Sequence, residues 1–504
     1  MKGLLFIFLL TLNIPFISYA NKDCSFDPLK TQNCIDSPPP PFLRHCYSQC
    51  LEKNEPLYID DFVSLALYFN PDTRNSWANV MASAAGLGSA LSNYFPQINA
   101  EADYTGSFIF SSINSSTSAG SAALLPGVSG KSGAHATNVL DAGATLSYLI
   151  YDFGGREASV AVARFSLIAS DWTYNSILQT TIFSTVSAYY NYIASKALVV
   201  VADETLASTK ASLDAANLRY EVGSAPLLDV LQAQTAYAQA KLQKIQAEAQ
   251  EAINKGTLLN TIGFDADTDI NIGEKPIAVN EIYDPFSLNV HSLIECAKNY
   301  RPDLTSSQYQ VASKKAAIKV AEAKDWPTIA LNSGYRFTHQ LSGSRFTAGN
   351  QSSAVLEVSI ALPIFTGFNN YYQIKLAKEN YNAQVALYNK TSLGVFFDLW
   401  QAYQNFKAAY QSVVTTEELL KTAQEADRVA RGRYQAGAGS ILDLLLAQSQ
   451  LASARQQYIQ AEYSWLTDRM NLIRALGLLT QQRTQDAQSV IARKPSTSLP
   501  IPRK

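Results

Sequence analysis

The sequence carries little charge and no excess of either sign. Charged residues make up 16% of its 504 residues, and 42 acidic side chains nearly balance 40 basic ones, for a net charge of −2. A chain with so weak a net field has nothing to attract a polyanion, so we expect no nucleic-acid partner.

Catalytic signatures are missing as well. The four histidines (His45, His135, His291 and His339) are scattered and form no His-Glu-x-x-His pattern, and there is no Gly-x-x-x-x-Gly-Lys phosphate loop. We therefore predict that the protein is not an enzyme, that it has no metal and no cofactor, and that any energy it needs comes from a partner.

Long apolar runs are confined to the N-terminus. Residues 1–20 combine Lys2, an apolar stretch over 4–17 and the ending Ser18-Tyr19-Ala20, which is the pattern of a secretory signal peptide. The rest of the sequence has no uninterrupted apolar run of the about 20 residues that a membrane helix needs. If the exported chain enters a membrane, it must do so with strands closed into a barrel.

Cysteine is scarce and clustered. Four of the five cysteines lie in a Pro-rich N-terminal extension over residues 21–57, at Cys24, Cys34, Cys46 and Cys50. In an oxidising compartment an even set of cysteines predicts two disulfides, whose pairing the sequence does not determine. His45 with Cys46 and Cys50 also fits a metal site, but the exported context favours disulfides.

Four segments alternate between apolar and polar residues. They cover about 97–110, 140–151, 328–339 and 354–363. In the first segment, Ile98 and Tyr104 share one face while Asp103 lies on the other. This period is typical of transmembrane strands, although half-buried strands of a soluble sheet show it too. Since the smallest membrane barrels have about eight strands, four per chain require an oligomer, with 111–139 and 341–353 as outer loops.

The remaining sequence predicts very long helices. After Gly155 there is neither Pro nor Gly up to Arg219, and at about 1.5 Å per residue such a helix is a rod of roughly 100 Å. A matching segment from about 369 to 433 has no proline and two glycines, Gly394 and Gly432. An ordinary antiparallel bundle would explain these helices but not the strands.

One stretch occurs twice. Residues 219–234 are RYEVGSAPLLDVLQAQ and residues 433–448 are RYQAGAGSILDLLLAQ, at a constant offset of 214. Each copy ends a helix with Arg-Tyr, turns on a glycine and starts a new helix, so each is the tip of a hairpin of two helices.

The duplication extends over most of the chain. Asn70-Pro71-Asp72 matches Arg301-Pro302-Asp303 at an offset of 231, and Phe153-Gly154-Gly155 matches Phe365-Thr366-Gly367 at an offset of 212. We predict a first repeat over 58–263 (tip 219–229), an equatorial connector over 264–289, a second repeat over 290–477 (tip 433–443) and a disordered tail over 478–504.

Together these motifs resemble the TolC family of outer-membrane efflux proteins. The resemblance covers residues 58 to about 480 and rests on the two Pro-Asp helix starts, the Phe95-Pro96 and Trp326-Pro327 entries to strands, the strand-to-helix turns and the two Arg-Tyr-x-x-Gly tips. No single motif is specific, whereas their order, duplication and spacing together are.

The resemblance implies an α+β membrane protein that forms a homotrimer. Each protomer would give four strands to a twelve-stranded β-barrel in outer-membrane lipid of a Gram-negative bacterium, continuous with a long α-helical barrel in the periplasm. The trimer would conduct substrate passively, as the exit duct of tripartite efflux or type I secretion. Its partners would be a periplasmic adaptor (membrane fusion) protein and an inner-membrane pump of RND or ABC type. The residues leave one alternative, a structural or adhesive outer-membrane surface protein without pump coupling.

The resemblance also implies roles for the tips, which would lie at the inner end of the duct. Gate candidates are Asp443, Asp229, Arg433 and Arg219, and adaptor-docking candidates are Gly223, Ser224, Gly437, Gly439 and Ser440. Asp443 matches a carboxylate at the constricted entrance, and three copies around an axis would bind cations. Leu446 stands where a second acidic residue would, which puts a double acidic ring in doubt. A plainer alternative is that Asp at a helix start and Arg at a helix end only favour the helix dipole.

Overall fold

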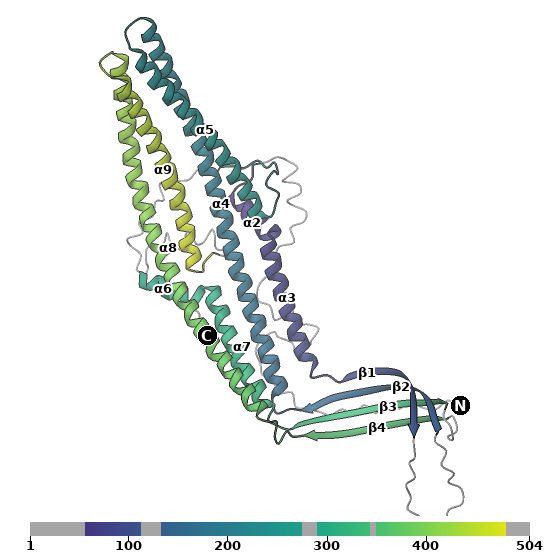
Figure 1. Ribbon diagram of the computed structural model, residues 1–504. Coiled ribbons are helices and arrows are strands. Elements are labelled where there is room, and N and C mark those ends of the chain that lie inside the picture. The colour runs from purple at the N-terminus through teal and green to yellow at the C-terminus, as the bar shows by residue number, and fades with distance from the viewer. Residues whose placement is uncertain (1–55, 112–132, 275–289, 343–348, 480–504) are drawn as a thin grey trace, which may run out of the picture.

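The molecule has a helical end and a stranded end. The computed structural model describes residues 56–111, 133–274, 290–342 and 349–479, and its long helices extend away from a four-stranded sheet (Figure 1). The predicted signal peptide, the four cysteines of the extension and residues 480–504 of the predicted tail lie outside the described residues.

Four antiparallel strands form the sheet in the order β1-β2-β3-β4. They are β1 (Gln97–Ser111), β2 (Gly133–Tyr151), β3 (Thr328–Ser342) and β4 (Asn350–Ala361). β2 and β4 begin before the alternating segments, so residues 133–139 and 350–353 belong to strands and not to the outer loops in which we expected them. Ladder hydrogen bonds join backbone groups, so a strand can continue past the alternating side chains. Within the described chain, the outer edges of β1 and β4 have no partner strand.

Two hairpins of long helices carry the tips at the end remote from the sheet. The first joins α4 (Gly155–Glu221) to α5 (Leu227–Ile262), and the second joins α8 (Asn369–Gln435) to α9 (Ile441–Ala475). α4 and α8 have 67 residues each, and α9 packs against α4, so that the hairpins lie side by side (Figure 1). None of the helices in the described ranges is apolar enough over a sufficient length to cross a membrane.

Shorter helices precede the strands. α2 (Ile59–Phe69) and α3 (Pro71–Ser92) come before β1, and α6 (Val290–Tyr300) and α7 (Pro302–Ala323) come before β3. Proline opens both α3 and α7, where its missing N–H and fixed φ suit the first helical position. α3 packs on α4, and α7 packs on both α4 and α8.

The backbone repeats itself as the sequence does, with one correction. Two successive residues with positive φ, Phe153 and Gly154, precede α4, whereas Gly367 and Phe368 precede α8. The turns therefore correspond at an offset of 214, and the predicted match at 212 is wrong by two residues. The turn needs two left-handed residues, and glycine relieves the strain at the first position in one copy and at the second in the other.

The main core lies midway along the rods, where both hairpins meet α2 and α6. Its fully buried side chains include Phe62 of α2, Leu259 of α5, and Leu399 and Phe406 of α8. Cys296 of α6 is partly buried against this core. Smaller buried clusters lie toward the two ends of the rods, one where α3 packs on α4 and one at the tips.

Candidate functional site

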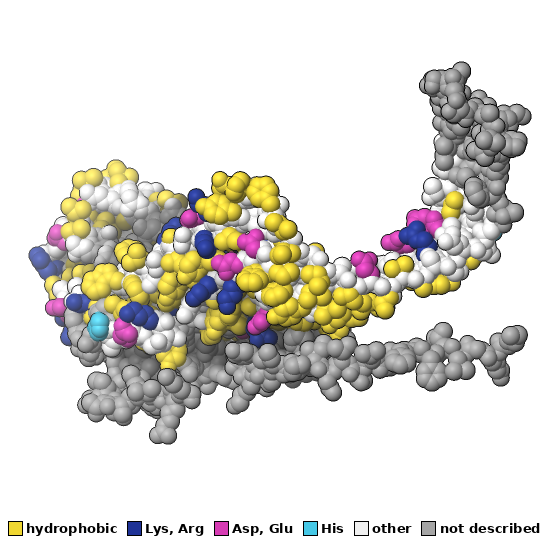
Figure 2. Space-filling view, turned by 90° about the horizontal axis from the view of Figure 1, so that it is seen from below, with side chains coloured by type: hydrophobic (Ala, Val, Ile, Leu, Met, Phe, Trp, Pro, Cys, Tyr) yellow, Lys and Arg dark blue, Asp and Glu magenta, His cyan; other side chains and the backbone are white. Residues whose placement is uncertain are grey.

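The sheet has one apolar face. The strand register places Ile98 opposite Leu146, and Leu331 opposite Val358. Ile98 and Val358 are 71% and 63% exposed. Figure 2 shows hydrophobic side chains gathered over the strands next to the helical end. Large apolar side chains directed outward from one face of a sheet suit contact with lipid.

The opposite face of the sheet is polar. One row of paired residues across the four strands is Gln97, Ser147, Asn332 and Glu357, and another is Asp103, Asp141, Thr338 and Gln351. The Thr338 hydroxyl donates to the Asp141 carboxylate at 2.5 Å. A polar face of this kind suits a water-filled interior.

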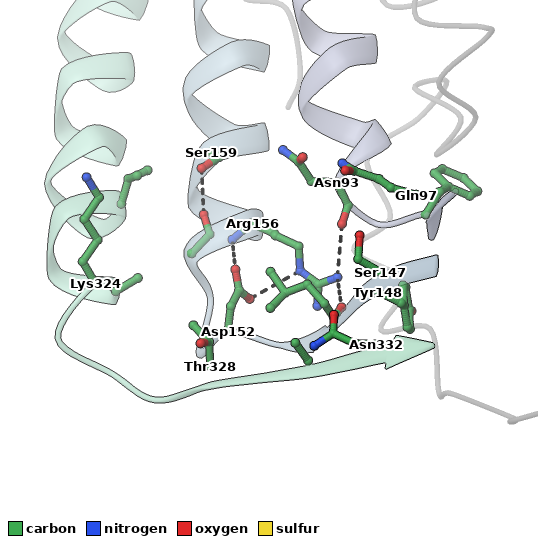
Figure 3. Close-up of a pocket in the computed structure, with 16 residues that line it drawn as sticks. Asn93, Gln97, Ser147, Tyr148, Asp152, Arg156, Ser159, Lys324, Thr328 and Asn332 are labelled. Carbon is green, nitrogen blue, oxygen red and sulfur yellow. Dashed lines mark hydrogen bonds and ion pairs between the residues drawn. The ribbon is translucent and has the colours of Figure 1, made fainter. Parts of the chain in front are cut away.

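Arg156, in the first turn of α4, joins the sheet to the helices (Figure 3). Its guanidinium donates to the carbonyls of Leu149 (2.7 Å) and Ile150 (2.9 Å) at the end of β2, and to that of Asn93 (3.4 Å) after α3. The Asp152 carboxylate accepts the Arg156 backbone N–H at 2.6 Å and lies 3.5 Å from Nε. These contacts tie the first turn of α4 to the end of β2 and to the chain after α3.

The second repeat replaces this arginine with an amide at the equivalent place. Asn370 donates to the Lys324 carbonyl (3.3 Å) and the Asp325 carboxylate (2.8 Å) after α7. Sequence analysis missed both residues. A signal was present for Arg156, because a positive charge in the first turn of a helix opposes the helix dipole and so needs acceptors nearby.

Both tips have the same turn. At the first tip, the N–H of Ser224 donates to the Arg219 carbonyl (2.8 Å) and the N–H of Gly223 to the Tyr220 carbonyl (2.9 Å). At the second, the N–H of Ala438 donates to the Arg433 carbonyl at 2.9 Å. This Schellman pattern needs a left-handed residue, and the predicted glycines supply it, with φ of +74° at Gly223 and +75° at Gly437.

The remaining docking candidates shape the second tip. Ser440 caps α9, since its hydroxyl accepts the Asp443 N–H at 3.1 Å. A Cβ on Gly439 would lie 3.1 Å from the Arg433 Cβ, so a side chain at this position would crowd the end of α8. The exposed turn and the capped helix start leave backbone groups accessible at the tip.

The structure brings Arg219 against the other tip. Its Nη2 donates to the Tyr434 carbonyl (2.5 Å) and the Gln435 carbonyl (3.4 Å), and its guanidinium lies 4.2 Å from the centre of the Tyr434 ring. Burial raises the pKa of the Tyr434 hydroxyl, Arg219 lowers it and Asp229 raises it. The buried hydroxyl has no hydrogen-bond partner among the described residues.

Arg433 and Asp443 remain on their own tip. Arg433 donates a long bond, 3.4 Å, to the Ala438 carbonyl, and it lines an open groove together with Gly439 and Asp443. Asp229 and Asp443 both lie in the first turn of the second helix of a tip. Arg219 and Arg433, equivalent in sequence, thus have different surroundings.

Comparisons with known proteins agree on one family. A family model described as outer membrane efflux protein matches residues 62–263 and 293–478. Protein CyaE of Bordetella pertussis is 28% identical over 429 residues, 85% of each chain. The toluene efflux pump outer membrane protein TtgC of Pseudomonas putida is 29% identical over 339 residues, 66% of this chain and 68% of TtgC.

The fold also matches a solved structure. The Campylobacter jejuni CmeC outer membrane channel superposes with a TM-score of 0.67 at 19% identity, over 95% of this chain and 94% of CmeC. The two ranges matched by the family model each contain one long hairpin with its tip, and they leave out the connector.

Proposed function

Because this chain belongs to the outer membrane efflux protein family, we propose that its two tips form the gated, adaptor-facing end of an outer-membrane exit duct. Proteins of this family are channels rather than enzymes, form trimers, and act in tripartite efflux or type I secretion. The chain therefore conducts substrate out of the periplasm, and the partners that select the substrate lie further inward.

The unpaired strand edges support a closed trimer. An exposed edge carries unpaired N–H and C=O groups, which cannot remain unsatisfied in lipid. Four strands are too few to close on themselves. Pairing β4 of one protomer with β1 of the next gives twelve strands, with the apolar face toward lipid and the polar face toward the lumen.

The observation that carries the docking proposal is the duplicated glycine turn at the far end of the rods. α4 and α8 place the tips 67 residues of helix away from the sheet. The turns at Gly223 and Gly437 present backbone without a side chain, so another helical hairpin can approach closely. We assign this surface to a periplasmic adaptor, which joins the duct to an inner-membrane pump of RND or ABC type.

The gate proposal rests on charge at the same end. Three copies of Asp443 around a narrow axis would bind cations, and Asp229 adds a second carboxylate position from the first repeat. Arg219 restrains the relative movement of the two tips through its bonds to the Tyr434 and Gln435 carbonyls. Opening the duct requires that these bonds be broken or replaced.

The first test is a photocrosslink from Ser440 in living cells, with the captured proteins identified by mass spectrometry. We expect an adaptor in the product, and its companion pump identifies the class of cargo. Trimers with no adaptor captured, in cells that express such pumps, would contradict the docking proposal.

A pair of glycine variants provides a functional test. Gly223→Leu with Gly437→Leu places bulk on both turns, and we expect export to be lost while the trimer still assembles. Gly432→Leu is the matched control, because Gly432 lies within α8 with open space around it and its equivalent in the first repeat is already Leu218. Unchanged export in the double variant would contradict the docking proposal.

A further inference from the structure

A hollow lies where the long helices meet the sheet (Figure 3). Its volume is about 450 Å³, which is within the range of small-molecule sites. Residues of α4 and α7 line it together with residues of β1, β2 and β3, so one chain supplies the whole hollow. The strand residues include Gln97, Ser147 and Asn332 of the polar face, so the hollow opens on that face of the sheet.

The hollow has one positive charge that is not balanced. The charged side chains that line it are Asp152, Arg156 and Lys324. Asp152 and Arg156 pair with each other, since the Asp152 carboxylate lies 3.5 Å from the Arg156 Nε. Within the described part of the chain, the Lys324 ammonium forms no ion pair and no hydrogen bond. Lys324 is therefore available to an anion.

The other copy of this junction shows that the fold does not require the charge. At the repeat offsets, Asn370 is equivalent to Arg156, and Asn93 is equivalent to Lys324. Asn370 donates to the Lys324 carbonyl just as Arg156 donates to the Asn93 carbonyl, so the same contact forms with and without a cation. A lysine at the end of α7 also favours the helix dipole, but α3 ends at Asn93 with no cation in its last turn. The positive charge thus belongs to this hollow rather than to the repeated fold.

The lining offers both apolar surface and polar groups. Val320 and Ala323 of α7 are apolar, whereas Gln97 and Asn332 present amides from the strands. An adjoining hollow of about 330 Å³ lies between α4, α7 and α8, and Val320 and Lys324 line both hollows. A molecule with its charge at Lys324 can therefore place an apolar part along the helices.

We propose that this hollow binds a small amphipathic organic anion, whose anionic group lies at Lys324 and whose apolar part lies on Val320 and Ala323. The inference rests on the duct of the proposed function, in which the polar face of the sheet surrounds the lumen and the hollow lies on the path of the cargo. A site on an exit path must also release what it binds, and one ammonium among neutral amides binds weakly enough to allow release. Each protomer contributes one such site.

Ligand-observed fluorine NMR on the purified full-length trimer in lipid nanodiscs tests the site. The probe is para-trifluoromethylbenzoate, and para-trifluoromethylbenzylamine carries the opposite charge on the same ring. We expect the trimer to broaden the benzoate signal more than empty nanodiscs do, and to bind the amine more weakly. Because a charge-assisted contact is lost, Lys324→Gln should weaken benzoate binding at least about tenfold.

Lys319→Gln is the matched control, because it removes the same charge from the same helix. Lys319 is exposed and lines neither hollow, so benzoate binding should be unchanged. Lys324→Glu should reverse the preference, so that the amine binds more tightly than the benzoate. Native electrophoresis of each variant checks that the trimer is intact.

Two outcomes would overturn the inference. One is a trimer that broadens the benzoate signal no more than empty nanodiscs do. The other is a Lys324→Gln variant that binds the benzoate as tightly as Lys319→Gln does, which would place the anion elsewhere. Neither outcome bears on the glycine variants or on the crosslink from Ser440, which test the docking proposal. Conversely, benzoate binding that depends on Lys324, in a protein whose export ignores the glycine variants, would support the site and contradict the docking proposal.

Discussion

The guanidinium of Arg219 donates hydrogen bonds to two carbonyls of the second tip and also lies over the Tyr434 ring. A guanidinium can donate to two carbonyls while lying over a ring, which an ammonium cannot do. The Tyr434 ring beneath it is buried, with 4% of its surface exposed. This one side chain therefore couples the packing of the two hairpins through a contact between residues 215 positions apart in sequence.

Removing Arg219 should loosen the inner end of the duct. Hydrogen bonds from a charged donor contribute about 1.5–3 kcal/mol, so Arg219→Ala should raise the open fraction at least about tenfold. The measurement is single-channel recording of the purified trimer in planar bilayers. Arg428→Ala is the control, since Arg428 lies on the surface and pairs with the exposed Glu425 at 2.9 Å. Equal open fractions in the two variants would show that Arg219 restrains nothing.

Glu462 in α9 gives a pH-dependent prediction. Burial, and next the charge of Glu274, raise the pKa of its carboxyl. Burial also raises the pKa of the neighbouring Tyr458 and Tyr463, so these hydroxyls stay neutral over the relevant range. Since the folded state holds the Glu462 proton more tightly than the unfolded chain, stability falls as pH rises from the unfolded to the folded pKa.

Glu462→Gln should therefore raise the thermal unfolding midpoint at neutral pH, by on the order of a degree. Below about pH 4 the native carboxyl is protonated in both states, and the two proteins should unfold at the same temperature. Glu379→Gln, at an exposed position, should have no effect at either pH. A gain from Glu462→Gln that is equally large in acid would mean that packing, rather than charge, is its cause.

The helices and strands were largely predictable because their signals are local. Period-two alternation located the strands, and the absence of Pro and Gly located the rods, since both patterns follow from backbone geometry. The α+β fold class, the resemblance to outer-membrane efflux proteins and the outer-membrane location are confirmed. The sequence comparison misaligned the strand-to-helix turns of the two repeats by two residues. It matched Phe and Gly by identity, whereas the equivalent positions are the two left-handed residues of each turn.

Contacts between the repeats were not predictable in the same way. Arg219 reaches Tyr434 only because α9 packs on one particular side of α4, and helical periodicity does not specify that side. The cluster at Arg156 depends on the chain after α3, at Asn93, meeting the turn between β2 and α4. The roles of Asp443 and Asp229 at a gate, and of the glycines in docking, remain predictions.

The two faces of the sheet give a prediction for single strands. A positive charge at the middle of the lipid face costs roughly 2–4 kcal/mol, whereas a lumen position tolerates it. Val358→Arg, on the apolar face, should lower the amount of folded trimer in the outer membrane. Glu357→Arg, one residue earlier on β4 and on the polar face, should leave it unchanged. Equal yields would show that the apolar face does not contact lipid.

In the proposed trimer, charge pairs within a chain and charge pairs between chains would differ in what they stabilise. Arg455 and Glu204 form an ion pair at 2.8 Å between two hairpins of one chain. Their equivalents at the offset of 214, Lys241 and Glu418, are exposed and of opposite charge, and in the proposed trimer they would join separate protomers. The ion pair between protomers should therefore change the stability of the trimer, while the pair within each chain should not.

Reversing these charges separates the two cases. Lys241→Glu or Glu418→Lys alone replaces attraction with repulsion at three interfaces, and we expect the trimer to dissociate at lower temperature. The double swap should restore it. Exposed pairs contribute about 0.2–1 kcal/mol each and are screened by salt, so the loss should shrink as ionic strength rises. The measurement is the fraction of trimer on native electrophoresis after stepwise heating. Reversing Arg455 and Glu204 is the matched control, because that pair lies within one chain. No rescue in the double swap would place Lys241 and Glu418 outside the interface between protomers. An equal loss of trimer in the control would show that charge reversal acts through the fold of each chain.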